Sequence, residues 1–533
     1  MTSLLRRHGI LLAAAGLVLA ALVVAPGLGL LSRMAQPGAA NPFALSATQM
    51  HAVKETFQLL LGVALVTGIL GVSTAWLVAV HEFPGRRWLE IGLVLPLAFP
   101  TYLAAYVAVD LFDFFGPVQG MLRAMFGPKP GGGPWLPDLR SLPGAVAILG
   151  LVLLPYVYVP CRILFSRTGR NVIEAARLLG ASGAGLFFRI GLPIARPAIL
   201  AGGVLALLEA LNDLGAVEYL GVSSLSAVIR DLWINRNDMA GAARLAGLMV
   251  LLVAALLMID PRARTGESQR QAKDHTTEPR RVPLAGLAAL AATLFCALPV
   301  LLGFALPALH LGGRALAYLG AQRMDSELLA ALASTLALGL AVSLIVVATG
   351  AIIAIAQRTS GGFSRLGTIA MLGYATPATV LVLAMMPVIG LIDGGVARLG
   401  LPFLFIGSSA AMLYALAARF LGIGTTQANL ALARLPTNVD AVARIHGLGD
   451  MALAWRIHRP AIAPGLKLGA LLVFIDTVKE LPATLLLRPL NFETLATRAY
   501  SKASAGLFEH GAVDSLLIVA ISAMAALLLS RRS

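Results

Sequence analysis

Four carboxylates lie inside long apolar stretches of the sequence, where a charged group is costly. Glu209 and Asp213 are four residues apart in one stretch, and Asp476 and Glu480 have the same spacing in another. This spacing places each pair on one face of a helix. In a low-dielectric environment such carboxylates must be protonated, paired with a cation or exposed to water. They are typical of a substrate path or a proton relay in a membrane.

Neighbouring polar residues extend this candidate path. Asn212 precedes Asp213, and Lys479 precedes Glu480, while Arg244 lies in a third apolar stretch. Lys479 and Arg244 are the candidate cationic neighbours of the carboxylates. We expect Asp213 and Glu480 to occupy equivalent positions on two facing helices beside a translocation path. The alternative is structural ion pairing between helices.

The sequence lacks the motifs of an enzyme or an ATPase. The dipeptide Gly-Lys never occurs, so the phosphate-binding motif G-x-x-x-x-G-K-[ST] cannot be built. The apolar stretches hold neither a G-x-S-x-G elbow nor an H-E-x-x-H pair. We therefore expect a protein that is not an enzyme and binds no cofactor, and a metal site stays open. The histidines, which form no ligand cluster, are His8, His51, His81, His275, His310, His446, His458 and His510.

The composition predicts a membrane protein. Of 533 residues, 58% are hydrophobic and only 13% are charged, and the mean hydropathy is +0.84. A soluble domain has about twice that share of charged residues. The elements that hold the polar residues are therefore membrane-spanning helices, each of about 20 residues.

Twelve apolar segments are long enough to span a membrane, in two sets of six. A polar stretch, 260–282, separates the sets and is predicted to be a linker. The expected spans lie near 10–32, 55–80, 89–110, 144–164, 198–220, 241–259, 284–308, 329–356, 367–392, 402–420, 466–488 and 512–530.

The basic residues predict the orientation. With the N-terminus in the cytoplasm, about twice as many Lys and Arg residues fall on cytoplasmic segments as on the opposite side. Both termini are therefore expected to be cytoplasmic. The net charge of +15 is explained by this orientation and by anionic headgroups, so we expect a lipid bilayer and no nucleic acid as partner.

The two halves contain an internal repeat at an offset of 267 residues. The segment 174–193 matches 441–460, and the next span keeps the register, so that Asp213 falls on Glu480. Each repeat contains an even number of spans, so both halves have the same orientation. The fold class expected is an all-α polytopic membrane protein of two parallel-repeated six-helix halves.

Two loops on the predicted cytoplasmic side, 162–197 and 419–465, are long and carry the repeated segment. In the first loop, Glu174 begins a run of helix formers, Gly180 can break that helix, and Pro193 is expected to end a second one. The product is a short helix-turn-helix. An exposed apolar ridge on such an element could insert into a groove on a soluble partner.

At these loops the sequence resembles the inner-membrane permeases of binding-protein-dependent ABC importers. Their signature is E-A-A, three residues, G, nine residues, I, one residue, L-P. Residues 174–193 match it at every defined position: Glu174, Ala175, Ala176, Gly180, Ile190, Leu192 and Pro193. The second copy is degenerate, with Ala441 in place of the Glu and Arg459 in place of the Leu. Its candidate coupling residues are Asp440, Arg444, Gly447, Ile457 and Pro460.

The resemblance implies the fold of a type I ABC importer permease in a bacterial inner membrane. In that family the two loops form the coupling helices that dock on ATPase subunits. It implies two copies of an ABC ATPase, which bind ATP and Mg, and a periplasmic substrate-binding protein. The expected domains are an anchor helix and periplasmic loop at 1–54, a first transmembrane domain at 55–259, the linker at 260–282, helix seven and a periplasmic loop at 283–328, and a second transmembrane domain at 329–533.

Two segments, 210–222 and 476–497, are similar to the corresponding parts of fused two-half ferric-iron permeases. This resemblance implies Fe(III) as the substrate. Related permeases carry thiamine, phosphonates, polyamines or sulfate, and these alternatives stay open. An ion-coupled secondary transporter, with the carboxylates as its relay, and an intramembrane enzyme are the competing classes. The coupling signature argues against the first, and the missing catalytic motifs argue against the second.

Overall fold

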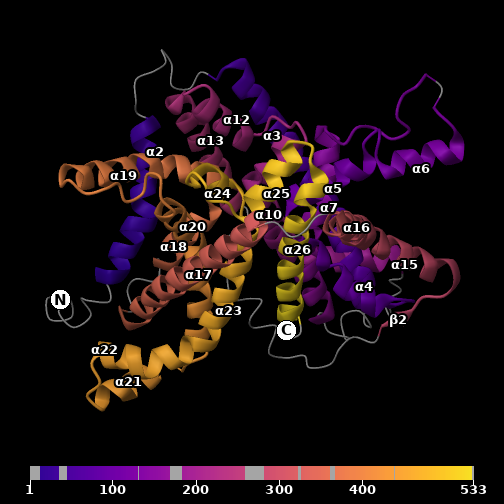
Figure 1. Ribbon diagram of the computed structural model, residues 1–533. Coiled ribbons are helices and arrows are strands. Elements are labelled where there is room, and N and C mark those ends of the chain that lie inside the picture. Colours follow the sequence, from indigo (N-terminus) through magenta and orange to yellow (C-terminus); the bar gives the residue numbers. More distant parts are fainter. Residues whose placement is uncertain are drawn as a thin grey trace. The chain divides into compact units, whose positions relative to one another are not determined.

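Nearly all of the described chain is helical, as the sequence predicted (Figure 1). The only strands among the described residues are β1 (His81–Glu82) and β2 (Val282–Pro283), which pair in parallel. The structure is a computed structural model, and it describes residues 13–34, 45–129, 131–167, 183–258, 281–321, 326–360, 366–436 and 438–530.

The chain divides into two compact units, and each unit combines segments from both halves of the sequence. The first-half unit comprises 45–228, 251–323 and 499–533, and the second-half unit comprises 1–44, 229–250 and 324–498. Helices at the ends of each half therefore pack with the core of the other half. The domain limits expected above follow the sequence repeat and stay a prediction.

The first-half unit is built on the long helix α3 (Ala47–Val80), which packs against α7 and α10. Its other helices are shorter or interrupted. In chain order they are α4 (Arg86–Gly92), α5 (Thr101–Phe112), α6 (Pro117–Phe126), α7 (Leu142–Arg167), α9 (Gly183–Leu186), α10 (Leu192–Asn212), α11 (Gly215–Tyr219), α12 (Leu225–Arg230), α15 (Gly286–Val300), α16 (Leu306–Ala321) and α26 (Phe508–Ser530).

The second-half unit is built in the same way on α17 (Ser326–Ser360), which packs against α20 and α23. Helices α12, α13 and α25 each cross a limit of this unit. In chain order the helices are α2 (Ala25–Met34), α13 (Met239–Met258), α17, α18 (Leu366–Ala375), α19 (Ala378–Arg398), α20 (Ala410–Leu432), α21 (Asn438–Ile445), α22 (Asp450–Leu453), α23 (Arg459–Val478), α24 (Pro482–Leu487) and α25 (Leu495–Ser504).

The helices α3 and α17 are longer than a bilayer requires. They contain 34 and 35 residues, and at 1.5 Å per residue each is about 50 Å long, against a hydrocarbon core of about 30 Å. The start of α3 is fixed by a capping box, in which the Ser46 side chain accepts from Gln49 N–H and the Gln49 side chain accepts from Ser46 N–H. Both helices are therefore longer than the hydrocarbon core of a bilayer.

Glycine allows the central helices of each unit to approach closely. A Cβ on Gly202 of α10 would lie 2.3 Å from the Tyr156 carbonyl oxygen of α7. In the other unit, a Cβ on Gly350 of α17 would lie 2.6 Å from the Gly424 carbonyl carbon of α20. Small residues at such crossings are typical of membrane helix packing, where close backbone contact replaces the hydrophobic effect.

Ten helices of the described residues are long and apolar enough to cross a membrane. The remaining two expected spans are occupied by α20 and α26, each of 23 residues. The expected spans at 198–220, 367–392 and 466–488 are each interrupted, between α10 and α11, between α18 and α19, and between α23 and α24. The expected span at 89–110 is also wrong as a continuous helix. Pro96 lies in a 3₁₀ turn after α4, and Pro100 immediately precedes α5, so the chain is broken there.

Candidate functional site

The second predicted coupling loop is a helix-turn-helix, as expected from the sequence. Helix α21 ends at Ile445, Gly447 turns the chain with a φ of +80°, and α22 follows at Asp450. The left-handed φ explains the glycine at this position. In the first loop, Glu174, Ala175, Ala176 and Gly180 lie outside the described residues, so their roles stay predictions.

The proline of each loop does not end a helix, which corrects the expectation for Pro193. A π-helical turn, Phe187–Gly191, leads directly into α10, and Pro193 lies in the first turn of α10. No α-helical N–H is needed at that position, so the proline is tolerated and the helix continues. The second copy repeats this arrangement, with the π turn Ala454–His458 before Pro460 in α23.

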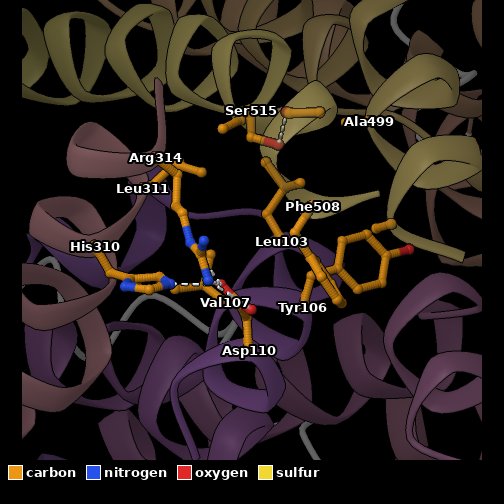
Figure 2. A pocket seen from close by; sticks show the side chains of 13 residues that line it. Leu103, Tyr106, Val107, Asp110, His310, Leu311, Arg314, Ala499, Phe508 and Ser515 are labelled. Atoms are coloured by element: carbon orange, nitrogen blue, oxygen red, sulfur yellow. Dashed lines mark hydrogen bonds and ion pairs between the residues drawn. The ribbon is translucent and has the colours of Figure 1, made fainter. Parts of the chain in front are cut away.

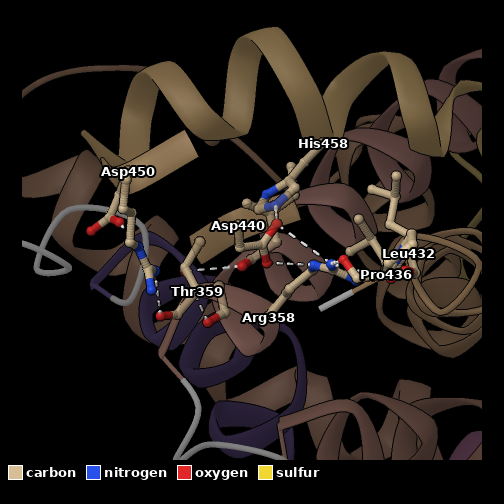
Figure 3. Close-up of polar contacts among 11 residues, drawn as sticks. Arg358, Thr359, Leu432, Pro436, Asp440, Asp450 and His458 are labelled. Atoms are coloured by element: carbon tan, nitrogen blue, oxygen red, sulfur yellow. Dashed lines mark hydrogen bonds and ion pairs between the residues drawn. The ribbon is translucent and has the colours of Figure 1, made fainter. Parts of the chain in front are cut away.

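Asp440 of the second loop points inward and binds two basic side chains (Figure 3). Its Oδ2 accepts from Arg358 Nε at 2.7 Å, and its Oδ1 lies 3.1 Å from His458 Nε2. Arg444, also predicted to act in coupling, donates to the Thr359 carbonyl at 3.3 Å and lies 3.4 Å from Asp450. Both predicted coupling residues therefore join the loop to neighbouring elements.

The contacts of Asp440 also set its ionisation. Burial alone raises the pKa of this carboxyl, but the hydrogen bonds from Arg358 and His458 lower it by more. The net effect holds the pKa of Asp440 below its usual value. The carboxylate is therefore ionised at neutral pH.

The opposite side of this helix-turn-helix exposes a row of large apolar residues, which we call the apolar ridge. Its members are 51–82% exposed. Arg459 lies over the Trp455 ring, 4.1 Å from the ring centroid. The predicted Ile457 is half-buried beside this surface, and Pro460 is exposed. An amphipathic helix with such a face is suited to insertion into a groove. The apolar ridge consists of Val442, Ile445, Met451 and Trp455.

After each coupling loop, a spanning helix ends next to an acidic residue. The carboxylate of this residue accepts hydrogen bonds from the first turn of the next short helix. Asp213 Oδ1 accepts from Ala216 N–H at 2.8 Å in the first turn of α11. Glu480 Oε1 accepts from Ala483 N–H at 2.8 Å, and its Oε2 accepts from Thr484 N–H at 3.0 Å, in the first turn of α24. These residues are 7% and 5% exposed. Asp213 and Glu480 therefore have similar local geometry, and their relation by a pseudo-twofold axis beside a path stays a prediction.

Other predicted path residues differ in burial and pairing. Asp476 and Lys479 are half-buried and paired at 2.9 Å. Asn212 is buried, whereas Glu209 is half-buried. Arg244 donates to the Ala240 carbonyl of its own helix at 3.2 Å. The proposed facing of the two carboxylate-bearing helices stays a prediction.

The cation beside Glu480 was not predicted from the sequence. Arg419 NH1 lies 3.4 Å from Glu480 Oε1, and the two side chains are 9% and 2% exposed. Arg419 had been placed at the edge of an expected span at 402–420, whereas α20 continues to Leu432. If the expected span had been extended to Pro436, Arg419 would have been placed inside the helix.

A second missed cluster lies on α5, α16 and α26 and lines a small pocket (Figure 2). Asp110 Oδ2 lies 2.6 Å from His310 Nε2 and 3.2 Å from Arg314. Arg314 also pairs with Glu509 at 2.6 Å. Asp110 and His310 were at the limits of expected spans, so no pattern in the sequence joined them. The cluster ties three helices of one unit together.

In each unit a similar hydrogen bond joins the first long helix to a later short helix. Thr56 Oγ1 of α3 accepts from Leu225 N–H at 2.9 Å, and Thr335 Oγ1 of α17 accepts from Leu495 N–H at 2.8 Å.

Among the described residues, no group of His, Cys, Asp and Glu side chains is arranged to hold a metal ion.

Comparisons with known proteins identify the family. Residues 67–260 match the model of the binding-protein-dependent transport system inner membrane component. The chain is 31% identical over 235 residues to the sulfate transport system permease protein CysW of Escherichia coli K12, covering 42% of this chain and 78% of the relative. It is 28% identical over 204 residues to CysT of Salmonella typhimurium, also a sulfate transport system permease protein, covering 37% and 69%.

A further relative has a different substrate in its name. The chain is 27% identical over 195 residues to the molybdenum transport system permease protein ModB of Escherichia coli K12, covering 36% of this chain and 82% of the relative. This chain belongs to the family of binding-protein-dependent transport system inner membrane components. It is the multi-pass, inner-membrane permease of a type I ABC importer, a transport subunit and not an enzyme.

Proposed function

We propose that this permease imports ferric iron delivered by a periplasmic binding protein, with ATP hydrolysed by two copies of a separate ATPase. The observation that carries the transport mechanism is the helix-turn-helix of 438–458 with its apolar ridge. Support for iron comes from the segments 210–222 and 476–497, which resemble ferric-iron permeases. These segments contain the equivalent Asp213 and Glu480 turns.

In this proposal both coupling loops face the cytoplasm and dock on the ATPases. Insertion of the apolar ridge into a groove removes apolar surface from water and so favours docking. ATP-driven closure of the ATPases then draws the loops together and rocks the two halves about the substrate path. ATP and Mg bind to the partner, and this chain holds no cofactor.

The half-buried polar residues are better placed to meet a passing substrate than the buried ones. Glu209, Asp476 and Lys479 retain exposure, whereas Asp213 and Glu480 are occupied by backbone N–H groups. Carboxylate oxygens are suitable ligands for a hard cation such as Fe(III). A path must bind its substrate weakly enough to release it. We infer that these half-buried residues line the path and that Asp213 and Glu480 shape it.

A second candidate substrate is an oxyanion, because the named relatives are sulfate and molybdenum permeases. The half-buried Lys479, with the backbone N–H groups of the interrupted helices, would then be the relevant group. Asp476 neutralises this lysine at 2.9 Å, which favours the cation over the oxyanion.

Uptake by whole cells distinguishes the substrates. Cells that lack this gene, with and without the gene restored, are given radiolabelled Fe(III), sulfate, molybdate, thiamine or a phosphonate. The proposal expects the gene to restore Fe(III) accumulation alone. Restored sulfate or molybdate uptake without an iron phenotype would replace iron by an oxyanion and leave the permease assignment in place.

A further inference from the structure

Arg358 connects the end of a long membrane helix to the second coupling loop. It lies in the last turn of α17, and its guanidinium contacts three segments of the chain (Figure 3). Nε donates to Asp440 of α21 at 2.7 Å, NH1 to the Leu432 carbonyl at the end of α20 at 2.6 Å, and NH2 to the Pro436 carbonyl at 3.1 Å. The arginine therefore holds the turn between α20 and α21 from both sides.

The contact is well sheltered. The Arg358 and Asp440 side chains are each 14% exposed, and His458, the other partner of Asp440, is 0% exposed. Charge-assisted hydrogen bonds of this kind are stronger than neutral ones, and shelter from water reduces their screening. The guanidinium contacts a carboxylate and two carbonyl groups through three separate nitrogen atoms, whereas lysine has one, so lysine is not an equivalent residue.

The docking surface and this contact are formed by different residues. The apolar ridge contains no partner of Arg358, and Ile445 at its centre is 82% exposed. Asp440, in contrast, points away from that surface and into the protein. A change at Arg358 can therefore loosen the base of the coupling helix while leaving the surface that meets the ATPase intact.

We propose that Arg358 is a positioning residue that makes α17 and the second coupling helix move as one body, so that ATPase closure is transmitted to the membrane. Arg444 adds a second contact between the same elements, through the Thr359 carbonyl. Asp440 is then an internal anchor of the loop, which explains why an acidic residue near the position of the signature Glu is turned inward. The inference rests on the proposed coupling to a separate ATPase.

The test measures ATPase binding and substrate transport separately. The full chain, its ATPase and its binding protein are reconstituted in proteoliposomes, with Arg358→Met and Arg358→Lys as variants. We expect both variants to retain the ATPase within about twofold on co-purification, while substrate uptake per ATP hydrolysed falls about tenfold for Met, the equivalent of one charge-assisted hydrogen bond. Uptake per ATP should be intermediate for Arg358→Lys, because lysine keeps the positive charge but lacks the planar guanidinium.

Arg398→Met is the matched control, since Arg398 also lies in the last turn of a long helix, α19, and is exposed. It should leave uptake per ATP unchanged. Equal loss of ATPase binding and uptake at Arg358 would mean a misfolded loop and would overturn the inference, as would unchanged uptake in both variants. If the wild-type chain itself fails to bind an ATPase, the proposed function is wrong instead.

Discussion

The two halves of the molecule differ in the contacts of their equivalent acidic residues, Asp213 and Glu480. Asp213 and Glu480 both hold the first turn of a short helix through backbone N–H groups. Glu480 also pairs with Arg419 of α20, whereas the residue 267 positions before Arg419 is Val152, which is buried in α7. The shared role is therefore to hold the turn after a spanning helix, and the ion pair is an addition of the second half.

The largest expected effect comes from removing the ion pair between Arg419 and Glu480. Arg419→Met leaves the Glu480 carboxylate buried without its cation, and this should destabilise the protein by about 3 kcal/mol. Thermal unfolding in detergent measures the loss. The double variant Arg419→Met with Glu480→Gln should recover most of it, because the uncompensated charge is gone. No difference between the single and double variants would contradict the pairing.

The coupling loops give the next comparison. Glu174 matches the family signature, whereas its counterpart is Ala441. We expect Glu174→Arg to weaken a pull-down of the ATPase subunit by about tenfold, because it reverses a charge at the proposed docking surface. Ala441→Arg should have a clearly smaller effect. Equal losses would mean that the two loops dock equivalently.

The helix-holding role itself predicts a smaller effect in the first half. Asp213→Ala removes an acceptor for an N–H group in a first turn, at a cost of about 1–2 kcal/mol. Glu480→Ala should cost more, because it also leaves Arg419 buried without its anion. Asp213→Asn and Glu480→Gln keep an acceptor and should preserve assembly. Unchanged uptake in both amide variants would exclude a direct role for these carboxylates in the path. Loss of uptake with intact assembly would restore that role.

The smallest effect concerns the pH dependence of the anchor at Asp440. Its pKa in the folded protein is lowered, so its stabilisation is present above the ordinary carboxyl pKa and is lost as the pH falls through the lower, folded value. Asp440→Asn should cost about 1 kcal/mol, because the amide keeps one acceptor but loses the charge. Thermal unfolding should show an undiminished difference between wild type and variant from pH 8 to about 5. A decrease in this difference above pH 5 would contradict the assignment.

The sequence predicted those features that depend on local patterns. Apolar runs predicted the helices, and Gly447 predicted the turn of the coupling loop, because both follow from the preferences of neighbouring residues. The repeat predicted the equivalence of Asp213 and Glu480. Pro482, early in α24, was also a local signal that a helix begins just after Glu480.

Contacts between residues distant in sequence could not be predicted in this way. Arg358 and Asp440 are 82 residues apart, and Asp110 and His310 are 200 apart. No spacing rule joins such residues, since helix packing alone brings them together. The role of Pro193 was wrong because a preceding π turn lets the helix continue through the proline.

The most direct test of the account is a transport measurement in proteoliposomes. Their membrane contains the reconstituted complex of this chain and its ATPase, and the binding protein loaded with Fe(III) is added outside. The account predicts Fe(III) uptake that requires ATP and the ATPase subunit and is abolished by vanadate. Uptake that persists with vanadate, or that an ion gradient drives in the absence of the ATPase, would contradict the coupling mechanism and identify a secondary transporter.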